Sequence, residues 1–143
     1  MGGIDLSWNQ AAKALSGCDC TVYRLTPSKH RAVGWIEIGL GFPVEIFVSP
    51  LLSEDKQLAT FLHEIAHART CSPPPIRNED WAEAVADRVS DMWLEWLGKQ
   101  WGTENLTIPE KVMCLAGENW TSQISTIVEY ELTKSAEREM GRA

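Results

Sequence analysis

The sequence has few basic residues and no basic block. Among its 143 residues, 13 are Lys or Arg and 20 are Asp or Glu, which gives a formal net charge of -7. The longest basic cluster, residues 29–31, contains three residues and is typical of a solvent-exposed turn. Because nonspecific binding to nucleic acid or to anionic membranes depends on clustered Lys and Arg, we expect neither.

The sequence also lacks long apolar runs and paired cysteine motifs. No run reaches the length of a membrane-spanning helix, and Asp5, Asn9 and Lys13 interrupt the apolar segment that a secretory signal needs. The four cysteines show no C-x-x-C spacing, which argues against a zinc ribbon and a thioredoxin-type motif. Cys18 and Cys20 are too close together for the usual zinc knuckle. We therefore predict a cytoplasmic protein with reduced thiols.

Length and hydrophobic content predict a single domain over residues 1–143. A chain of this length with 44% hydrophobic residues can form one core and is short for two. Apolar residues that end at Gly17 predict a helix over residues 6–16. Alternating apolar positions predict three strands, at residues 21–25, 33–38 and 44–48. Three short consecutive strands predict a small antiparallel three-stranded sheet, with residues 44–49 at or near an edge.

The remainder of the chain is predicted to be helical. Ser53 is a suitable N-cap with acidic residues in the following turn, so we expect a helix from near residue 54 to the prolines at 73–75. Asn78 is the expected N-cap of a further helix, whose apolar stripe ends at Gly98. Two more helical segments are expected at about 109–115 and 119–139. The predicted fold class is α+β, with the small sheet packed on a helical core.

Histidine is rare in this chain. Only three histidines occur, and two of them lie in the sequence HEIAH at residues 63–67. On a helix, His63 and His67 share one face, about 5 to 6 Å apart. Two imidazoles at this spacing with a carboxylate between them are typical of a helix that binds zinc and activates a water molecule. The simpler interpretation is that they are ordinary polar residues on an exposed helix face.

A catalytic zinc usually has three protein ligands and one open position, so the histidine pair needs a third ligand. The next helix offers Glu79, Glu83 and Asp87, which are spaced four apart and stack in one column. Like charges at this spacing destabilise an isolated helix by a few tenths of a kcal/mol per pair, and a bound cation reverses that effect. The alternative is a solvated acidic face that Arg88 and other basic residues neutralise.

The sequence HEIAH, followed by EAVAD at residues 83–87, resembles the gluzincin pattern of zincin metallopeptidases, in which a Glu-x-x-x-Asp segment on a following helix completes the zinc site. The compact layout resembles the ImmA/IrrE-type metallopeptidases and the minigluzincins, over roughly residues 33–97. ImmA/IrrE-type proteins commonly have Asn and Phe shortly after the Glu-Ala pair, whereas this chain has Val85 and Arg88. Nothing after Gly98 matches the pattern.

The resemblance implies a Zn2+ cofactor and five site residues. The ligands are His63, His67 and Glu83, the general base is Glu64, and Asp87 is a second-layer acceptor that orients a ligand histidine. Glu79 remains the alternative third ligand. The resemblance also implies one zincin-like metallopeptidase domain, with its catalytic core at about residues 33–98 and a C-terminal helical segment at about 106–143.

The function implied is hydrolysis of peptide bonds by a zinc-activated water, with Glu64 accepting the proton of that water. We expect narrow specificity toward a protein or peptide substrate, with a regulatory protein as the substrate that the resemblance implies. An edge strand at residues 44–49 is expected to pair with the extended substrate through main-chain hydrogen bonds.

The sequence leaves several points open. Four residues are equal candidates for stabilising the oxyanion, namely Tyr23, His30, Arg88 and Tyr130.

Two other functions share the same motif: a zincin-like protein-binding module with a structural or vestigial zinc site, and metal-assisted hydrolysis of a non-peptide amide. An intact Glu64 favours turnover, because a structural zinc site needs no general base.

Overall fold

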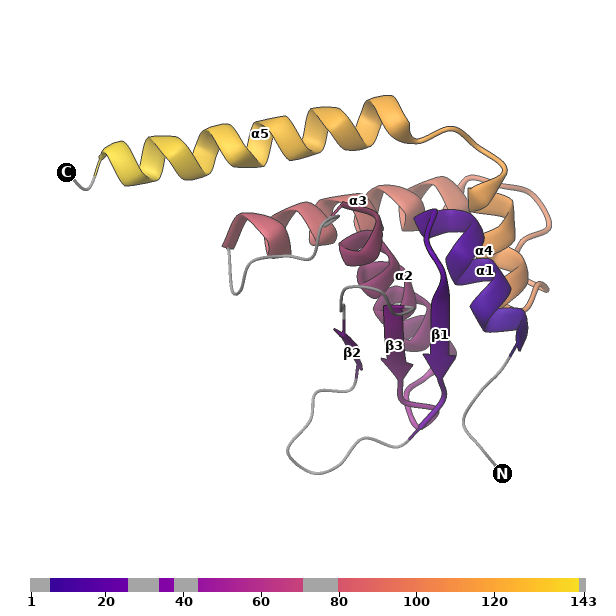
Figure 1. Ribbon diagram of the computed structural model, residues 1–143. Helices are drawn as coiled ribbons and strands as arrows, with labels where there is room; N and C mark the ends of the chain where they lie inside the picture. Colours follow the sequence, from indigo (N-terminus) through magenta and orange to yellow (C-terminus); the bar gives the residue numbers. More distant parts are fainter. Residues whose placement is uncertain (1–5, 26–33, 38–43, 71–79, 142–143) are drawn as a thin grey trace.

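The computed structural model describes residues 6–25, 34–37, 44–70 and 80–141, which form a mixed, mostly helical fold (Figure 1). The elements in chain order are α1 (Leu6–Ser16), β1 (Cys20–Tyr23), β2 (Gly34–Glu37), β3 (Val44–Val48), α2 (Glu54–Thr70), α3 (Asp80–Gly98), α4 (Ile108–Ala116) and α5 (Thr121–Met140). The predicted combination of helices and strands is therefore confirmed at the level of the mixed α and β class. Among the described helices, none has both the length and the apolar character that crossing a membrane requires.

The small sheet is mixed, so the prediction of a purely antiparallel sheet was wrong. Its strand order is β1-β3-β2, with β1 parallel to β3 and β2 antiparallel to β3. β3 lies in the centre of the sheet, and the edge position expected for residues 44–49 was also wrong. The reason is that alternation of apolar residues identifies the buried face of a strand but carries no information about its neighbours. A peptide has no free β3 edge with which to pair.

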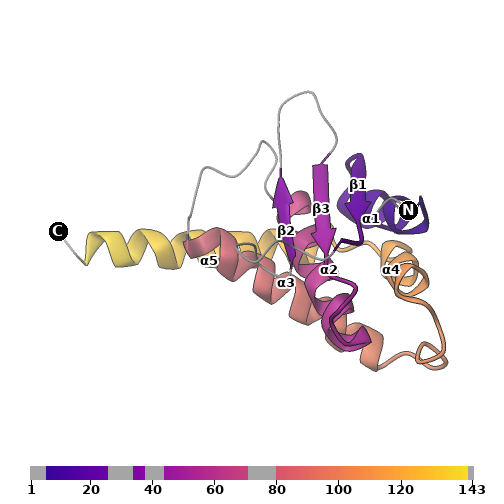
Figure 2. The ribbon, with the colours of Figure 1, turned by 90° about the horizontal axis from the view of Figure 1, so that it is seen from below.

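One face of the sheet packs on helices. Every second residue of β1 and β3 is buried, and this buried set is Cys20, Val22, Val44, Ile46 and Val48. α1 packs beside β1, and α2 packs against β2 and β3. Figure 1 and Figure 2 show these helices on the same side of the strands. The core therefore lies between the sheet and the helices.

The helix pair α2 and α3 forms the centre of that core. Residues spaced three or four apart turn one face of each helix inward: Leu58, Phe61, Leu62 and Ile65 on α2, and Val85, Val89 and Trp93 on α3. The two helices pack along each other. This packing fixes the rotation of α2 and α3, so that the residues beside the buried stripes also face one another.

Helix ends follow the local signals in the sequence. α2 begins one residue after Ser53, whose hydroxyl accepts a hydrogen bond from the backbone N–H of Lys56 at 3.3 Å. α1 ends where Gly17 adopts a φ of 83° and donates its N–H to the carbonyl of Lys13. α3 ends at Gly98 as predicted, whereas its expected N-cap, Asn78, lies outside the described residues.

The C-terminal helix α5 lies along α3 and extends beyond it toward the chain end (Figure 1). Its inner face carries Ile124, and Glu131 from the same face is buried as well.

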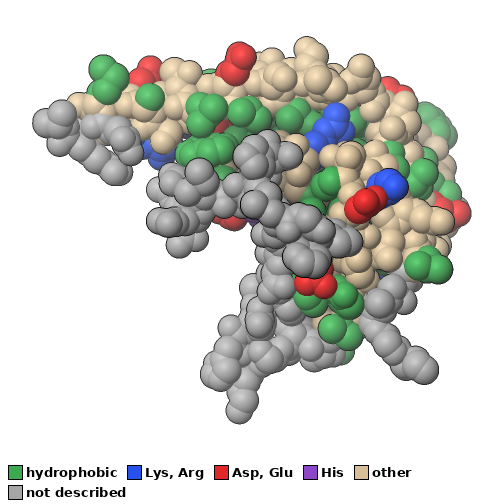
Figure 3. Space-filling view, viewed as in Figure 1, with side chains coloured by type: hydrophobic (Ala, Val, Ile, Leu, Met, Phe, Trp, Pro, Cys, Tyr) green, Lys and Arg blue, Asp and Glu red, His purple; other side chains and the backbone are tan. Residues whose placement is uncertain are grey.

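The molecular surface seen in Figure 3 has no basic patch. The described Lys and Arg side chains are scattered over it, as the lack of a basic block in the sequence predicts.

Candidate metal centre

α2 presents His63 and His67 on the face that looks toward α3. Because they lie one turn apart, both rings reach the same point, and their Nε2 atoms are 3.2 Å apart. Only 22% of the His63 side chain and 10% of the His67 side chain are exposed. The sequence prediction of two imidazoles on one helix face agrees with this placement.

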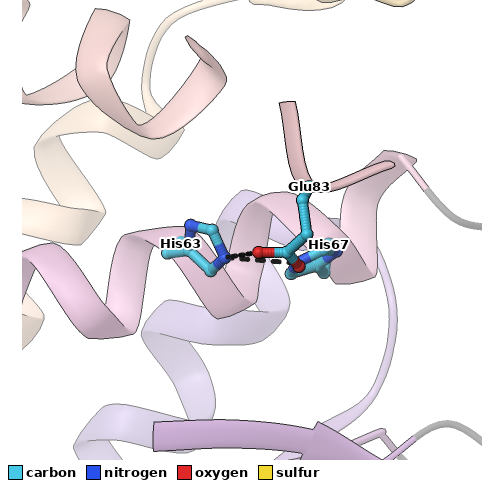
Figure 4. Close-up of side chains that lie close together, drawn as sticks. All are labelled: His63, His67 and Glu83. Atoms are coloured by element: carbon cyan, nitrogen blue, oxygen red, sulfur yellow. Dashed lines mark hydrogen bonds and ion pairs between the residues drawn. The ribbon is translucent and has the colours of Figure 1, made fainter. Parts of the chain in front are cut away.

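α3 contributes Glu83 to the same point (Figure 4). One carboxylate oxygen lies 3.3 Å from His63 Nε2, and the other lies 2.6 Å from His67 Nε2. The three residues offer ligand atoms that all lie within 4.8 Å of one another. His63, His67 and Glu83 therefore form a group that could hold a metal ion.

Two of the three distances between these atoms match the spacing of ligands around a tetrahedral zinc ion. Zinc–nitrogen bonds of about 2.0 to 2.1 Å at tetrahedral angles separate two nitrogens by about 3.3 to 3.4 Å. The observed distances of 3.2 Å between the histidine nitrogens and 3.3 Å from His63 to Glu83 are close to that value. The shorter contact between His67 and Glu83 has the length of a hydrogen bond. The contact between His67 and Glu83 is therefore the one distance of the three that is clearly shorter than the spacing of ligands around a tetrahedral zinc ion.

Asp87 lies one turn after Glu83 and contacts the other nitrogen of His63. The distance from Asp87 Oδ1 to His63 Nδ1 is 3.1 Å. A carboxylate that accepts a hydrogen bond from Nδ1–H fixes the tautomer in which Nε2 carries a free lone pair. Asp87 is therefore placed where a carboxylate can orient a metal-binding imidazole through its other nitrogen.

Glu64 is almost fully buried beside the ligand group, with 7% of the residue exposed. Burial, and secondarily the negative charge of Glu83, raises the pKa of Glu64 to about 8. A carboxyl group with a pKa near neutrality can both accept and release a proton under ordinary conditions.

Burial also lowers the pKa of His67, although the nearby Glu83 acts in the opposite direction. The neutral imidazole is the form that binds metals, so burial favours the ligand state of this residue. Glu83 and Asp87 are much more exposed, at 64% and 65% of their side chains. The group is thus buried on the α2 side and open to solvent on the α3 side.

The remaining sequence candidates are not gathered here. Glu79, the alternative ligand, and His30, one oxyanion candidate, lie outside the described residues. Tyr23 donates its hydroxyl hydrogen to Glu45 at 3.0 Å, on the sheet. The guanidinium of Arg88 lies 4.8 Å from the ring centroid of Tyr130 on α5. None of these contacts assigns an oxyanion-stabilising residue.

One charged residue of structural importance was missed in the sequence. Glu131 is buried within α5 and accepts a hydrogen bond from Arg88 Nη1 at 3.2 Å. Because Arg88 directly follows Asp87, this ion pair attaches α5 to the part of α3 that bears the site. Its signal was available, since Glu131 follows Ile124, Ile127 and Val128 at helical spacing and interrupts an apolar face.

Comparisons of this chain with protein-family models, with curated proteins and with solved structures found no match.

Proposed function

We propose that this protein is a zinc metallopeptidase of the gluzincin type, similar in layout to the ImmA/IrrE-type enzymes and minigluzincins. The observation that carries the proposal is the meeting of the HEIAH helix with Glu83 and Asp87 of the next helix at one point. The two sequence motifs are separated along the chain, and packing of α2 against α3 brings them together.

The ligand chemistry supports zinc as the metal. Two imidazole nitrogens and one carboxylate oxygen form the His2Glu set of several catalytic zinc sites, which keeps a fourth position for water or substrate. The exposure of Glu83 leaves the solvent side of the group accessible. A structural zinc site more often has four protein ligands in a closed arrangement. Within the described residues, only three ligands gather here.

The chain's own residues have separable tasks. His63, His67 and Glu83 would hold the ion, which supplies a water molecule of lowered pKa and a Lewis acid for the substrate carbonyl. Asp87 keeps the His63 ring in its ligand orientation. Glu64, which is buried beside the ligands, accepts the proton released from the water and returns it to the leaving amine.

The proposed substrate is a peptide segment of a protein, cleaved with narrow specificity, and a regulatory protein is the proposed class. Because β3 pairs on both sides, main-chain pairing with a substrate is open only to β1 and β2 in this sheet. We further propose a cytoplasmic location, on the basis that the described cysteines Cys18, Cys20 and Cys114 are all unpaired thiols.

The test compares Glu64→Gln with the wild-type chain after zinc reconstitution. A peptide library is incubated with each protein, and cleavage is followed by mass spectrometry while zinc is measured per chain. Glu54→Gln is the matched control, because Glu54 is an exposed glutamate on the same helix. The proposal expects the Glu64 variant to keep zinc and lose cleavage, with the control unchanged. Cleavage that survives in Glu64→Gln would contradict the assigned role.

The alternative of a protein-binding module makes a different forecast. If the site only holds zinc for a docking function, the wild-type chain binds zinc and cleaves no member of the library. In that case Glu64→Gln changes neither zinc content nor the binding of any partner. The same experiment therefore distinguishes the two functions.

A further inference from the structure

A second group of candidate metal ligands lies where α1 turns into β1. Ser16 is the last residue of α1, and the left-handed backbone of Gly17 reverses the chain direction after it. Cys20 opens β1 four residues later. An exposed ion pair between Lys13 and Asp19, with a separation of 3.0 Å, links the two sides of this turn. The turn is built from different elements than the centre between α2 and α3.

The turn brings two thiols to one oxygen atom. Cys18 donates its thiol hydrogen to the hydroxyl of Ser16 at 3.4 Å, and the thiol of Cys20 lies 3.4 Å from the same oxygen. Cys20 also donates to the carbonyl of Cys18 at 3.3 Å. Both cysteines are free. Two sulfur ligands with restricted positions lose little freedom when they bind one ion, which favours chelation.

The pair has one partly exposed member and one buried member. Cys18 is partly exposed, whereas Cys20 is 8% exposed and belongs to the core. Ser16 and Gly17 line a cleft of about 450 Å³, which Arg69 and residues 116–119 complete. Open space lies beside Gly17, where an added Cβ atom would meet nothing within 4 Å. The cleft therefore adjoins Ser16, whose hydroxyl contacts both thiols, and Cys18 is the more exposed member of the pair.

We propose that Cys18 and Cys20 form a chelating site for a soft, thiophilic cation of the Cu+ class. Thiolate ligands select soft metals, and Cu+ accepts low coordination numbers, whereas structural zinc requires four ligands. Within the described residues, no third His, Cys, Asp or Glu joins these two cysteines in a metal-binding group. On binding, each thiol releases its proton to solvent and forms a Cu–S bond, and neither sulfur nor copper changes oxidation state.

The test measures Cu+ affinity of the full, zinc-loaded chain under anaerobic conditions, in competition with a chromophoric Cu+ chelator. Cys18→Ser and Cys20→Ser remove one ligand each, and Cys114→Ser is the matched control, because Cys114 is an exposed free cysteine on α4. Loss of chelation in either single variant is expected to weaken binding by about 100-fold or more. The control is expected to retain wild-type affinity.

The proposal would be overturned if Cys18→Ser or Cys20→Ser bound Cu+ as tightly as the wild type. It would also be overturned if Cys114→Ser lost as much Cu+ affinity as these two variants. If Cys20→Ser fails to fold, alkylation of the wild-type chain gives an independent answer. One equivalent of Cu+ should protect Cys18 and Cys20 from iodoacetamide in mass spectra and leave Cys114 reactive. Reaction of Cys18 at its metal-free rate would refute the site. Zinc content is unaffected in every case, so this result is separate from the proposed peptidase function.

Discussion

Replacing Glu64 by Gln is expected to stabilise the metal-free protein at neutral and alkaline pH, even though it removes the proposed general base. Burial, together with the charge of Glu83, raises the pKa of Glu64 from 4.5 to about 8 in the folded chain. The folded state therefore binds more protons than the unfolded state between these two pH values. Its free energy of unfolding falls as the pH rises through this window, because the carboxyl group ionises in the unfolded chain while burial keeps it protonated in the folded chain.

The magnitude follows from the size of the shift. One pKa unit corresponds to about 1.4 kcal/mol, so the wild type loses at most about 5 kcal/mol across the window. Relaxation of the structure around the charge reduces this figure, and a difference of at least about 1 kcal/mol between the two proteins is expected near pH 8. Glutamine has nearly the same shape and does not titrate, so the variant avoids the loss. The histidines contribute to the pH dependence of stability in both proteins, and their contributions largely cancel when the two proteins are compared.

The assay is urea denaturation of chelator-treated wild-type and Glu64→Gln proteins at about pH 5 and about pH 8, with zinc-loaded samples in parallel. The free energy of unfolding of the variant, relative to that of the wild type, should be larger at the higher pH than at the lower pH. Added zinc should reduce this difference, because the cation stabilises the ionised carboxylate of the wild type. Parallel pH profiles for the two metal-free proteins would refute the assigned burial and pKa shift of Glu64.

Three further predictions concern single side chains. Asp87→Asn should lower zinc affinity by about 10- to 100-fold in a chelator competition. The control is Asp91→Asn, which changes an exposed residue one turn further along α3 and should leave the affinity unchanged. Equal affinities in the two variants would contradict the orienting role of Asp87. Arg88→Ala should destabilise the fold by about 1 to 3 kcal/mol in urea because it leaves the buried Glu131 without its ion-pair partner, and adding Glu131→Gln should restore part of the loss. Trp93→Ala should cost about 3 to 5 kcal/mol by opening a cavity in the core, and a cost below about 1 kcal/mol would show that Trp93 is not fully buried.

The helices and the histidine pair could be predicted from sequence because their signals are local. Ser53 marks a helix start through its side-chain hydroxyl, and Gly98 marks a helix end. The spacing of His63 and His67 places both on one face of any helix. The contact of these residues with Glu83 depends on packing of α2 against α3. Sequence reasoning selected Glu83 through the gluzincin resemblance, and its distances come only from the fold.

The sheet was harder to predict, since its topology depends on partners that are distant in the chain. Val44, Ile46 and Val48 alternate with half-buried residues, and this pattern is the same for a central strand and for an edge strand that packs on helices. The third strand of the chain, β3, lies between β1 and β2 in the sheet. The position of Glu131 on an apolar helix face was visible in the sequence, whereas its pairing with Arg88 depends on the packing of two helices.

The central claim is that His63, His67 and Glu83 bind one zinc ion, and elemental analysis of zinc per chain tests it most directly. The measurement compares metal-reconstituted wild type with His63→Ala and Glu83→Gln, after removal of loosely bound metal. The account predicts about one zinc per chain in the wild type and a clear loss in both variants. A wild-type chain without tightly bound zinc, or variants that retain it in full, would contradict the metal centre and the peptidase function proposed from it.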